Sequence, residues 1–329
     1  MSTRLQFLRL FGLSATAVLL GIGTPLHAAT VVDVDRGTVQ GERLFDPAGA
    51  AYAAVQVSGH RIGLRRLGTR LELSVSPPDA SAYTVLLDPE IAQVRQVRIH
   101  GQRLVVFGWM NGSLAVDVSV HDRLTGGAID RFWSYDATSS PDGRYIAFQK
   151  FYPSHFIDQW ESHYRLYDVS RDPGANRPAL RRSEPGEAGA DARVDVGVAL
   201  YPVSPGELDR DSADATPGTS HALASPFAWS PDSRRLGFVD VQGSAAQLVT
   251  VQMPVASPLS LSTRMAPLPE LGTLCNEGSS GRSCATLARD HLRLSLSDAA
   301  ARVTVQRPGA SQVEREVSVP ASRFAPAVP

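Results

Sequence analysis

Short apolar runs that follow turn signals dominate the hydrophobic pattern of this chain. The stretches "SSPDGRYIAFQ" (139–149) and "WSPDSRRLGFV" (229–239) each place Ser-Pro-Asp before Arg and a run of mostly apolar residues. Pro fixes φ and Asp can hydrogen-bond the backbone two residues on, so each copy predicts a tight turn. Gly143 permits a positive φ in the first copy, and Ser233 replaces it in the second. Because the runs are apolar on both faces, they predict strands sandwiched between neighbouring sheets.

Weaker copies of the same order occur at shorter intervals. Phe107, at the end of "GQRLVVF", precedes Phe148 by 41 residues, and Leu64, at the end of "SGHRIGL", precedes Phe107 by 43. The two strong copies are 90 residues apart, which we interpret as two such periods. The segment "ARVDVGVALYP" (192–202) is then the candidate for the missing unit, and "RDHLRLSL" (289–296) for a later one. A period of about 40–45 residues with several strands per unit is typical of a β-propeller blade.

Further strand candidates fill the gaps and complete an all-β prediction; they lie at 83–87, 113–120, 164–169 and 246–251. We predict a β-propeller of five to seven blades over residues 30–319. The alternative is a tandem pair of β-sandwiches, which also use short strands and turn signals. Residues 170–225, rich in Pro, Gly, Ala and Asp, predict long polar loops around one strand, and residues 320–329 predict a flexible tail.

These residues carry a resemblance to a known repeat. "SPDGRYIAF" and "WSPDSRRLGF" resemble the repeat of TolB-type propellers, which also occurs in propeller domains of prolyl-oligopeptidase and dipeptidyl-peptidase IV relatives. "QWESHYRLYDVSR" (159–171) is similar to the segment after the equivalent strand in dipeptidyl-peptidase IV-like chains. Trp229 stands where the repeat commonly has a Trp. The resemblance implies a propeller fold.

The motifs of the related peptidases are missing from the sequence. Their hydrolase domain needs a Gly-x-Ser-x-Gly elbow, which exposes the nucleophile on a strained turn. "GSSGRSC" from Gly278 has the wrong spacing, and no two Glu are adjacent to form the glutamate pair that grips a substrate amino terminus. We therefore expect the propeller alone, and we name no catalytic residue and no cofactor.

The N-terminal 29 residues predict a cleaved secretory signal peptide. Arg4 and Arg9 precede an apolar stretch at 10–22, and small residues follow up to Ala28 and Ala29. Cleavage there predicts a periplasmic or secreted protein with no membrane span after processing. The chain has 32 Lys and Arg against 33 Asp and Glu, a balance that argues against nucleic-acid binding, which needs a concentrated basic face.

Two cysteines predict one local disulfide. Cys275 and Cys284 are the only cysteines, and the loop between them is rich in Gly and Ser. In an exported protein such a pair is typical of a disulfide. The alternative, a two-thiol redox or metal site, lacks both the Cys-x-x-Cys spacing and a His between the cysteines.

The stretch after the first strong strand is the candidate binding surface. It contains aromatic and charged residues in a connecting segment, and propeller function usually resides in such loops. The predicted binding residues are Phe151, Tyr152, His155, Phe156, Trp160, Glu161 and His163. The alternative is that the aromatics fold back as a minor core. A metal site built from His155, Asp158, Glu161 and His163 has suitable ligands, but a solvated loop explains the same residues, so we predict no metal.

Three functions follow from this pattern. The first is a non-catalytic exported propeller that binds a protein or peptide partner through loop aromatics on one face. The second is a hydrolase of glycans or peptides whose acids converge in the central channel, since active sites built from several blades leave no local motif. The third is an accessory propeller that works beside a separate peptidase.

Overall fold

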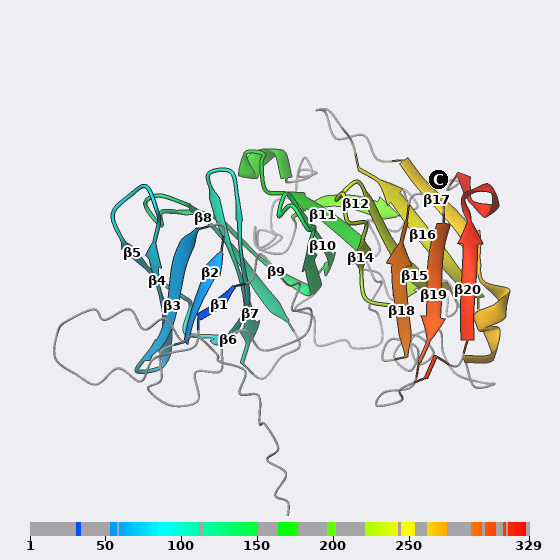
Figure 1. Cartoon of the computed structure of the whole chain (residues 1–329), viewed down its shortest axis with the longest axis horizontal. Helices are drawn as coiled ribbons and strands as arrows, with labels where there is room; N and C mark the ends of the chain where they lie inside the picture. Colours follow the sequence, from blue (N-terminus) through cyan, green and yellow to red (C-terminus); the bar gives the residue numbers. More distant parts are fainter. Residues whose placement is uncertain are drawn as a thin grey trace, which may run out of the picture.

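The computed structural model describes the strands and turns of an all-β chain. The described residues are 31–33, 53–57, 59–111, 115–150, 164–176, 196–201, 221–242, 245–253, 262–274, 291–297, 300–306, 312–313 and 315–326. Within them, short 3-10 turns accompany the strands, and no helix has the length and apolar character needed to cross a membrane. The sheets follow one another along the longest axis in chain order (Figure 1).

Hydrogen bonding groups the described strands into four sheets, which are almost entirely antiparallel. The first contains β1 (Val31–Asp33), β2 (Ala53–Val57), β3 (His60–Leu67), β4 (Arg70–Ser76) and β5 (Tyr83–Leu86). The second contains β6 (Ile91–His100), β7 (Arg103–Met110), β8 (Val116–Asp122), β9 (Ala128–Ser139), β10 (Tyr145–Lys150), β11 (Tyr164–Asp168) and β12 (Val198–Tyr201). The third contains β13 (His221–Leu223), β14 (Ala228–Trp229), β15 (Arg235–Gln242), β16 (Ala245–Gln252), β17 (Ser262–Pro267) and β21 (Ala325–Pro326). The fourth contains β18 (Leu292–Leu296), β19 (Ala300–Val305) and β20 (Arg315–Pro320). The short 3-10 turns are η2 (Pro173–Asn176), η3 (Pro269–Leu274) and η4 (Ala321–Arg323).

The seven-stranded sheet consists of two units that share β9. Residues 128–134 of this long strand pair with β8, and residues 134–139 pair with β10. Between the two halves, Asp136 has a positive φ of 54° and the register with β10 shifts. Such an irregularity bends a strand. We therefore number five units in the described chain: β1–β5, β6 to early β9, late β9 to β12, β13–β17 with β21, and β18–β20.

Each pair of consecutive units shares a hydrophobic cluster. Leu64 and Val106 belong to the cluster of units 1 and 2, and Phe107 and Phe148 to that of units 2 and 3. Further clusters join unit 3 to unit 4 and unit 4 to unit 5. Strands of the inner units are buried on both faces, as all five residues of β11 show. The expectation of sandwiched strands is confirmed for these units.

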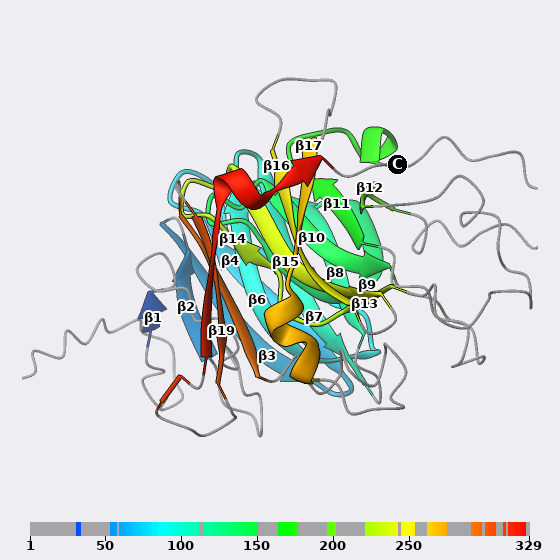
Figure 2. The ribbon, with the colours of Figure 1, turned by 90° about the vertical axis from the view of Figure 1, so that its right-hand side faces the viewer.

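Unit 5 ends the row with a polar face. Along its strands buried apolar residues alternate with exposed ones, and the exposed set includes Arg293, Ser295, Arg302, Glu316 and Ser318. Alternation of buried apolar and exposed polar residues is typical of a sheet that has one face in contact with solvent. Units 1 and 5 lie at opposite ends of the molecule (Figure 1), and a view from the side of units 4 and 5 shows the sheets one behind another (Figure 2). The described sheets therefore form an open row and do not close on one another.

The two Ser-Pro-Asp turns have the same hydrogen bonds. Ser140 Oγ donates to Asp142 Oδ1 at 2.6 Å and accepts from the amide of Tyr145 at 2.9 Å. Ser230 Oγ makes the equivalent bonds to Asp232 and to the amide of Arg235. The predicted turn chemistry is confirmed, with Asp142 accepting from the amide two residues on.

The two turns also lie side by side, which corrects the interpretation of their spacing. The amide of Asp142 donates to Ser233 Oγ at 3.0 Å, and Trp229 Nε1 donates to the carbonyl of Thr138 at 3.3 Å. The turns therefore belong to consecutive units, 3 and 4. The 90-residue interval therefore corresponds to one unit and not to two. The segment at 192–202, which was predicted as a missing unit, contributes β12, the last strand of unit 3. The weaker copies ending at Leu64 and Phe107 do lie on corresponding strands of units 1 and 2.

Candidate functional site

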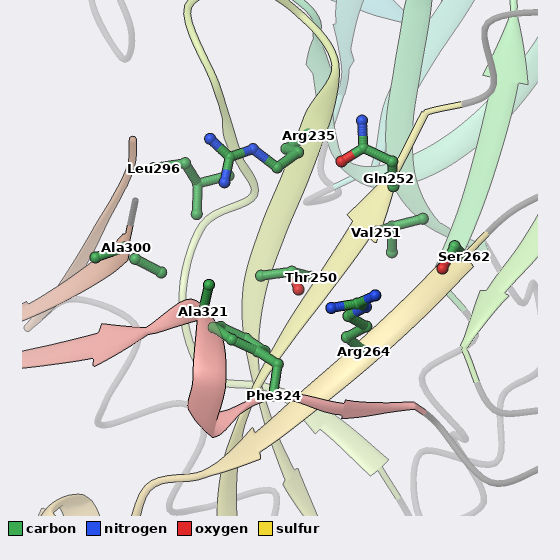
Figure 3. A pocket seen from close by; sticks show the side chains of 11 residues that line it. Arg235, Thr250, Val251, Gln252, Ser262, Arg264, Leu296, Ala300, Ala321 and Phe324 are labelled. Carbon is green, nitrogen blue, oxygen red and sulfur yellow. The ribbon is translucent and has the colours of Figure 1, made fainter. Parts of the chain in front are cut away.

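A cavity of about 290 Å³ lies between unit 4 and unit 5. It lies where β15 begins and β16 ends, just after the second Ser-Pro-Asp turn in sequence, and Figure 3 shows side chains that line it. Its lining is Arg235, Thr250, Val251, Gln252, Ser262, Arg264, Leu296, Ala300, Ala301, Ala321 and Phe324. These residues come from both sheets and from the C-terminal segment, so the packing of unit 5 on unit 4 creates the cavity.

The unit 4 wall is polar because the composition of one sheet face changes along its strands. Alternate residues of β15 point to unit 5, beginning with Arg235 and continuing to buried Val239 and Val241. The neighbouring strands change in the same way, from Leu248 to Thr250 on β16 and from Ala266 to Arg264 on β17. Strand register aligns these changes, since Thr250 is paired with Arg264. The apolar end packs against unit 5, and the polar end lines the cavity.

The opposite wall is apolar. Leu296 and Ala301 of unit 5 belong to the hydrophobic cluster that joins units 4 and 5, and Phe324 packs against the same cluster. Gly237 of β15 allows the close approach of this wall, because a Cβ at that position would lie 3.0 Å from the methyl groups of Leu294 and Leu296. Figure 3 shows Leu296 and Ala300 on one side of the cavity and the two arginines on the β15 and β17 side. The cavity is therefore half polar and half apolar.

The two arginines of the cavity differ in how they are held. Arg235 is half-buried and donates through Nη2 to the carbonyl of Ser297, at the end of β18. It also lies close enough to Asp232 to help lower the pKa of that carboxyl, after the larger effects of the Ser230 and Arg234 hydrogen bonds. The guanidinium of Arg264 is exposed and forms no hydrogen bond or ion pair with the part of the chain that the structure describes. Among the described residues of the lining, Arg264 is thus the cation available to a ligand.

A buried charge cluster between units 1 and 2 is the second candidate. Asp117 of β8 is 1% exposed and accepts from Arg131 Nε at 2.6 Å and from Trp133 Nε1 at 3.0 Å. Burial raises the pKa of the Asp117 carboxyl, although both donors act in the opposite direction. Arg131 also donates to Asp88, in the connection from unit 1, at 2.7 Å. Since the cluster ties two units together, we assign it a structural role.

The site residues predicted from the sequence lie outside the described residues. Phe151, Tyr152, His155, Phe156, Trp160, Glu161 and His163 fall between the end of β10 at Lys150 and the start of β11 at Tyr164. Cys275 and Cys284 also fall outside them, so the aromatic binding surface and the disulfide stay predictions. Among the described residues, no group of three or more His, Cys, Asp or Glu is placed to hold a metal ion.

Sequence reasoning missed the cavity. Arg264 and Arg235 are 29 positions apart in sequence, and neither lies in a recognisable motif. The available signal was the change from apolar to polar alternate residues along three consecutive strands. That signal shows a common site only once the register between β15, β16 and β17 is known.

No protein-family model matches this sequence, and no curated protein matches it either. Solved structures to which this chain is similar include TolB from Acinetobacter baumannii, with 12% identity over 68% of this chain and a TM-score of 0.29. Oligopeptidase B from Leishmania major has 9% identity over 82% of this chain and a TM-score of 0.35. The β-propeller domain of the Trilobed protease from Pyrococcus furiosus has 8% identity over 83% of this chain and a TM-score of 0.32.

The chain spans different shares of these proteins. It covers 44% of the TolB chain and 39% of the oligopeptidase B chain, but 83% of the Trilobed protease propeller domain. Each likeness has a low identity and a low TM-score, so no property of these proteins is carried over to this chain.

Proposed function

We propose that this protein is an exported, non-catalytic scaffold of propeller-type units that binds a protein or peptide partner in the cavity between units 4 and 5. The observation that carries the proposal is the half-polar, half-apolar lining of that cavity, which includes Arg264, an arginine that no described residue engages. Ligand sites are typically concave and apolar with a few placed polar groups. At about 290 Å³, the cavity suits one or two residues of a partner.

The chemistry of the lining favours binding over catalysis. The polar residues that line the cavity in the described part of the chain are Arg, Thr, Ser and Gln, and these described residues include no Asp, Glu, His or Cys. General acid–base catalysis at neutral pH relies mainly on the missing types. Buried acids of the described chain are instead engaged by other side chains, as Asp117 is by Arg131 within unit 2 and Asp240 is by Tyr164 across units 3 and 4.

The propeller assignment and the export route complete the proposal. The sequence repeat and the meander units packed in chain order support a TolB-like propeller architecture, with five units in the described residues. The number of blades in the whole domain, predicted as five to seven over residues 30–319, is part of the proposal. Export to the periplasm or outside the cell rests on Arg4, Arg9 and the apolar stretch before Ala29.

A peptide-binding screen tests this function. Mature protein is used to select peptides from a randomised library, and the affinity of the selected peptides is measured by calorimetry. Thr250→Phe, on the face of unit 4 that lines the cavity, should fill the cavity and weaken binding at least tenfold. Ser318→Phe, on the exposed outer face of unit 5, is the matched control and should leave binding unchanged. Selected peptides that bind both variants as well as wild type, or that are cleaved by the protein, would contradict the proposal.

A further inference from the structure

The charge of the cavity selects the sign of its ligand. Arg235 and Arg264 are the charged residues among the described residues of the lining, and both are cations. Arg235 already donates to the carbonyl of Ser297, which fixes its position. The Arg264 guanidinium carries donors that no described residue uses. Such a planar fork matches the two oxygens of a carboxylate and forms shorter, stronger hydrogen bonds with it than with a neutral acceptor.

The neighbours of Arg264 supply further hydrogen bonds on the same wall. Thr250 is its cross-strand partner, and Ser262 lies two residues before it on β17. Gln252 is paired both with Ser262 and with Arg235, so it stands between the two sides of the polar wall. These neutral groups can donate to an anion or accept from a peptide N–H. The wall therefore suits a carboxylate that is attached to a peptide bond.

The apolar wall faces this polar wall across the space between two packed sheets. Leu296, Ala301 and Phe324 provide methyl, methylene and ring surface. Stacked sheets lie about 10 Å apart, so one residue can reach both walls. The C-terminal residue of a peptide carries its carboxylate and its side chain on the same carbon. A glutamate or aspartate within a chain would need a groove that lets the peptide pass on both sides.

We propose that the cavity recognises the C-terminal residue of a peptide, with its carboxylate on Arg264 and an apolar side chain against Leu296 and Phe324. This inference rests on the proposed function and adds the ligand's chemical class to it. Arg235 is a positioning residue, since its bond to Ser297 holds the end of β18 beside the polar wall. Selectivity for an apolar C-terminal residue follows from the unit 5 wall.

Calorimetry with four small probes tests the proposal on the mature protein. The probes are acetyl-Gly-Gly-Leu as free acid, the same peptide as C-terminal amide, acetyl-Gly-Gly-Ser as free acid, and inorganic phosphate. We expect the Leu acid to bind at least tenfold tighter than its amide and several-fold tighter than the Ser acid. Arg264→Gln should abolish the preference for the acid, and Arg264→Lys should retain part of it. Arg302→Gln, an exposed arginine on the outer face of unit 5, is the matched control and should change nothing.

The outcomes separate this inference from the proposed function. Equal binding of the acid and the amide, with loss on Thr250→Phe, would overturn carboxylate recognition but keep a peptide-binding cavity. Binding of phosphate as tightly as the Leu acid, dependent on Arg264, would indicate a plain anion site and overturn the peptide terminus. Absence of binding by any probe, while library-selected peptides still bind, would overturn the ligand class alone. If neither the probes nor library-selected peptides bind, the proposed function is contradicted as well.

Discussion

Tyr164 donates its hydroxyl to Asp240 Oδ1 at 2.6 Å, across the boundary between units 3 and 4, and Asp240 is completely buried. Three residues later Tyr167 points to the other face of β11 and donates to Asp130 of unit 2 at 3.0 Å. Successive side chains of a strand point to opposite faces of the sheet, so residues three apart contact the neighbouring units on opposite sides. One short strand thus connects three units through two buried tyrosine–aspartate bonds.

The first prediction concerns this pair. Tyr164→Phe removes a donor from a buried carboxylate, which should lower the free energy of unfolding by about 1–3 kcal/mol. Urea unfolding followed by fluorescence measures the loss. Tyr83→Phe is the comparison, because the Tyr83 hydroxyl donates at 2.7 Å to the neutral carbonyl of Arg123 and its loss should cost less. A Tyr164→Phe variant as stable as wild type would show that the bond contributes nothing.

A second prediction concerns Ser233, the departure from Gly143 in the repeated turn. Ser233 has a φ of +61°, a conformation that favours glycine, and its hydroxyl accepts from the amide of Asp142. Ser233→Ala loses the hydroxyl and keeps the strained φ, so we expect a loss of about 1–2 kcal/mol. Ser233→Gly loses the hydroxyl but relieves the backbone, so it should cost less. Equal losses in both variants, measured by urea unfolding, would refute the strain argument.

A third prediction uses two glycines with the same backbone conformation. Gly126 and Gly68 have φ values of +72° and +62°, so Ala is strained at both. A Cβ at Gly126 would lie 2.5 Å from Cδ2 of Tyr83, whereas nothing lies within 4 Å at Gly68. We expect Gly126→Ala to be less stable than Gly68→Ala by about 1–3 kcal/mol, the usual cost of overpacking. Matching thermal stabilities would place Tyr83 away from this turn.

A fourth prediction concerns acid stability. Burial lowers the pKa of His121, although its hydrogen bond to the Gly126 carbonyl acts in the opposite direction. Below the unfolded value of about 6.5, the unfolded chain binds a proton at this position more readily than the folded protein does. The stability from neutral His121 is thus present above that pH and decreases as pH falls.

His121→Gln tests this dependence. The wild-type protein should lose more unfolding free energy between pH 7.5 and pH 5.0 than the variant, since other titrating groups are common to both. Urea unfolding at the two pH values provides the comparison. An identical pH dependence in both proteins would mean that His121 titrates normally in the fold.

The sequence predicted the local structure well. Ser-Pro-Asp turns and the following apolar strands depend on residues within a few positions, and both copies have the expected bonds. The unit count between the copies was wrong, because the 90-residue interval is one unit step and β12 belongs to unit 3. The amino-acid composition of a segment does not reliably show whether it is a long connection or a unit with a weakly matching repeat. The role of Ser233 was also hidden, since its partner Asp142 is 91 positions away.

The cavity required three-dimensional information. Its polar wall depends on the pairing of Arg235 with Gln252 and of Thr250 with Arg264. The register between strands cannot be predicted from the sequence of any single segment. Its apolar wall comes from the far end of the chain, through Leu296 and Phe324. The loop aromatics that the sequence favoured, from Phe151 to Trp160, remain a second binding prediction.

The crystal structure of the mature protein with acetyl-Gly-Gly-Leu bound is the most direct test of the central claim. The account predicts a peptide between units 4 and 5, with its terminal carboxylate within about 3 Å of the Arg264 guanidinium and its leucine side chain against Leu296 and Phe324. A peptide bound on another surface, with this cavity unchanged, would contradict the account.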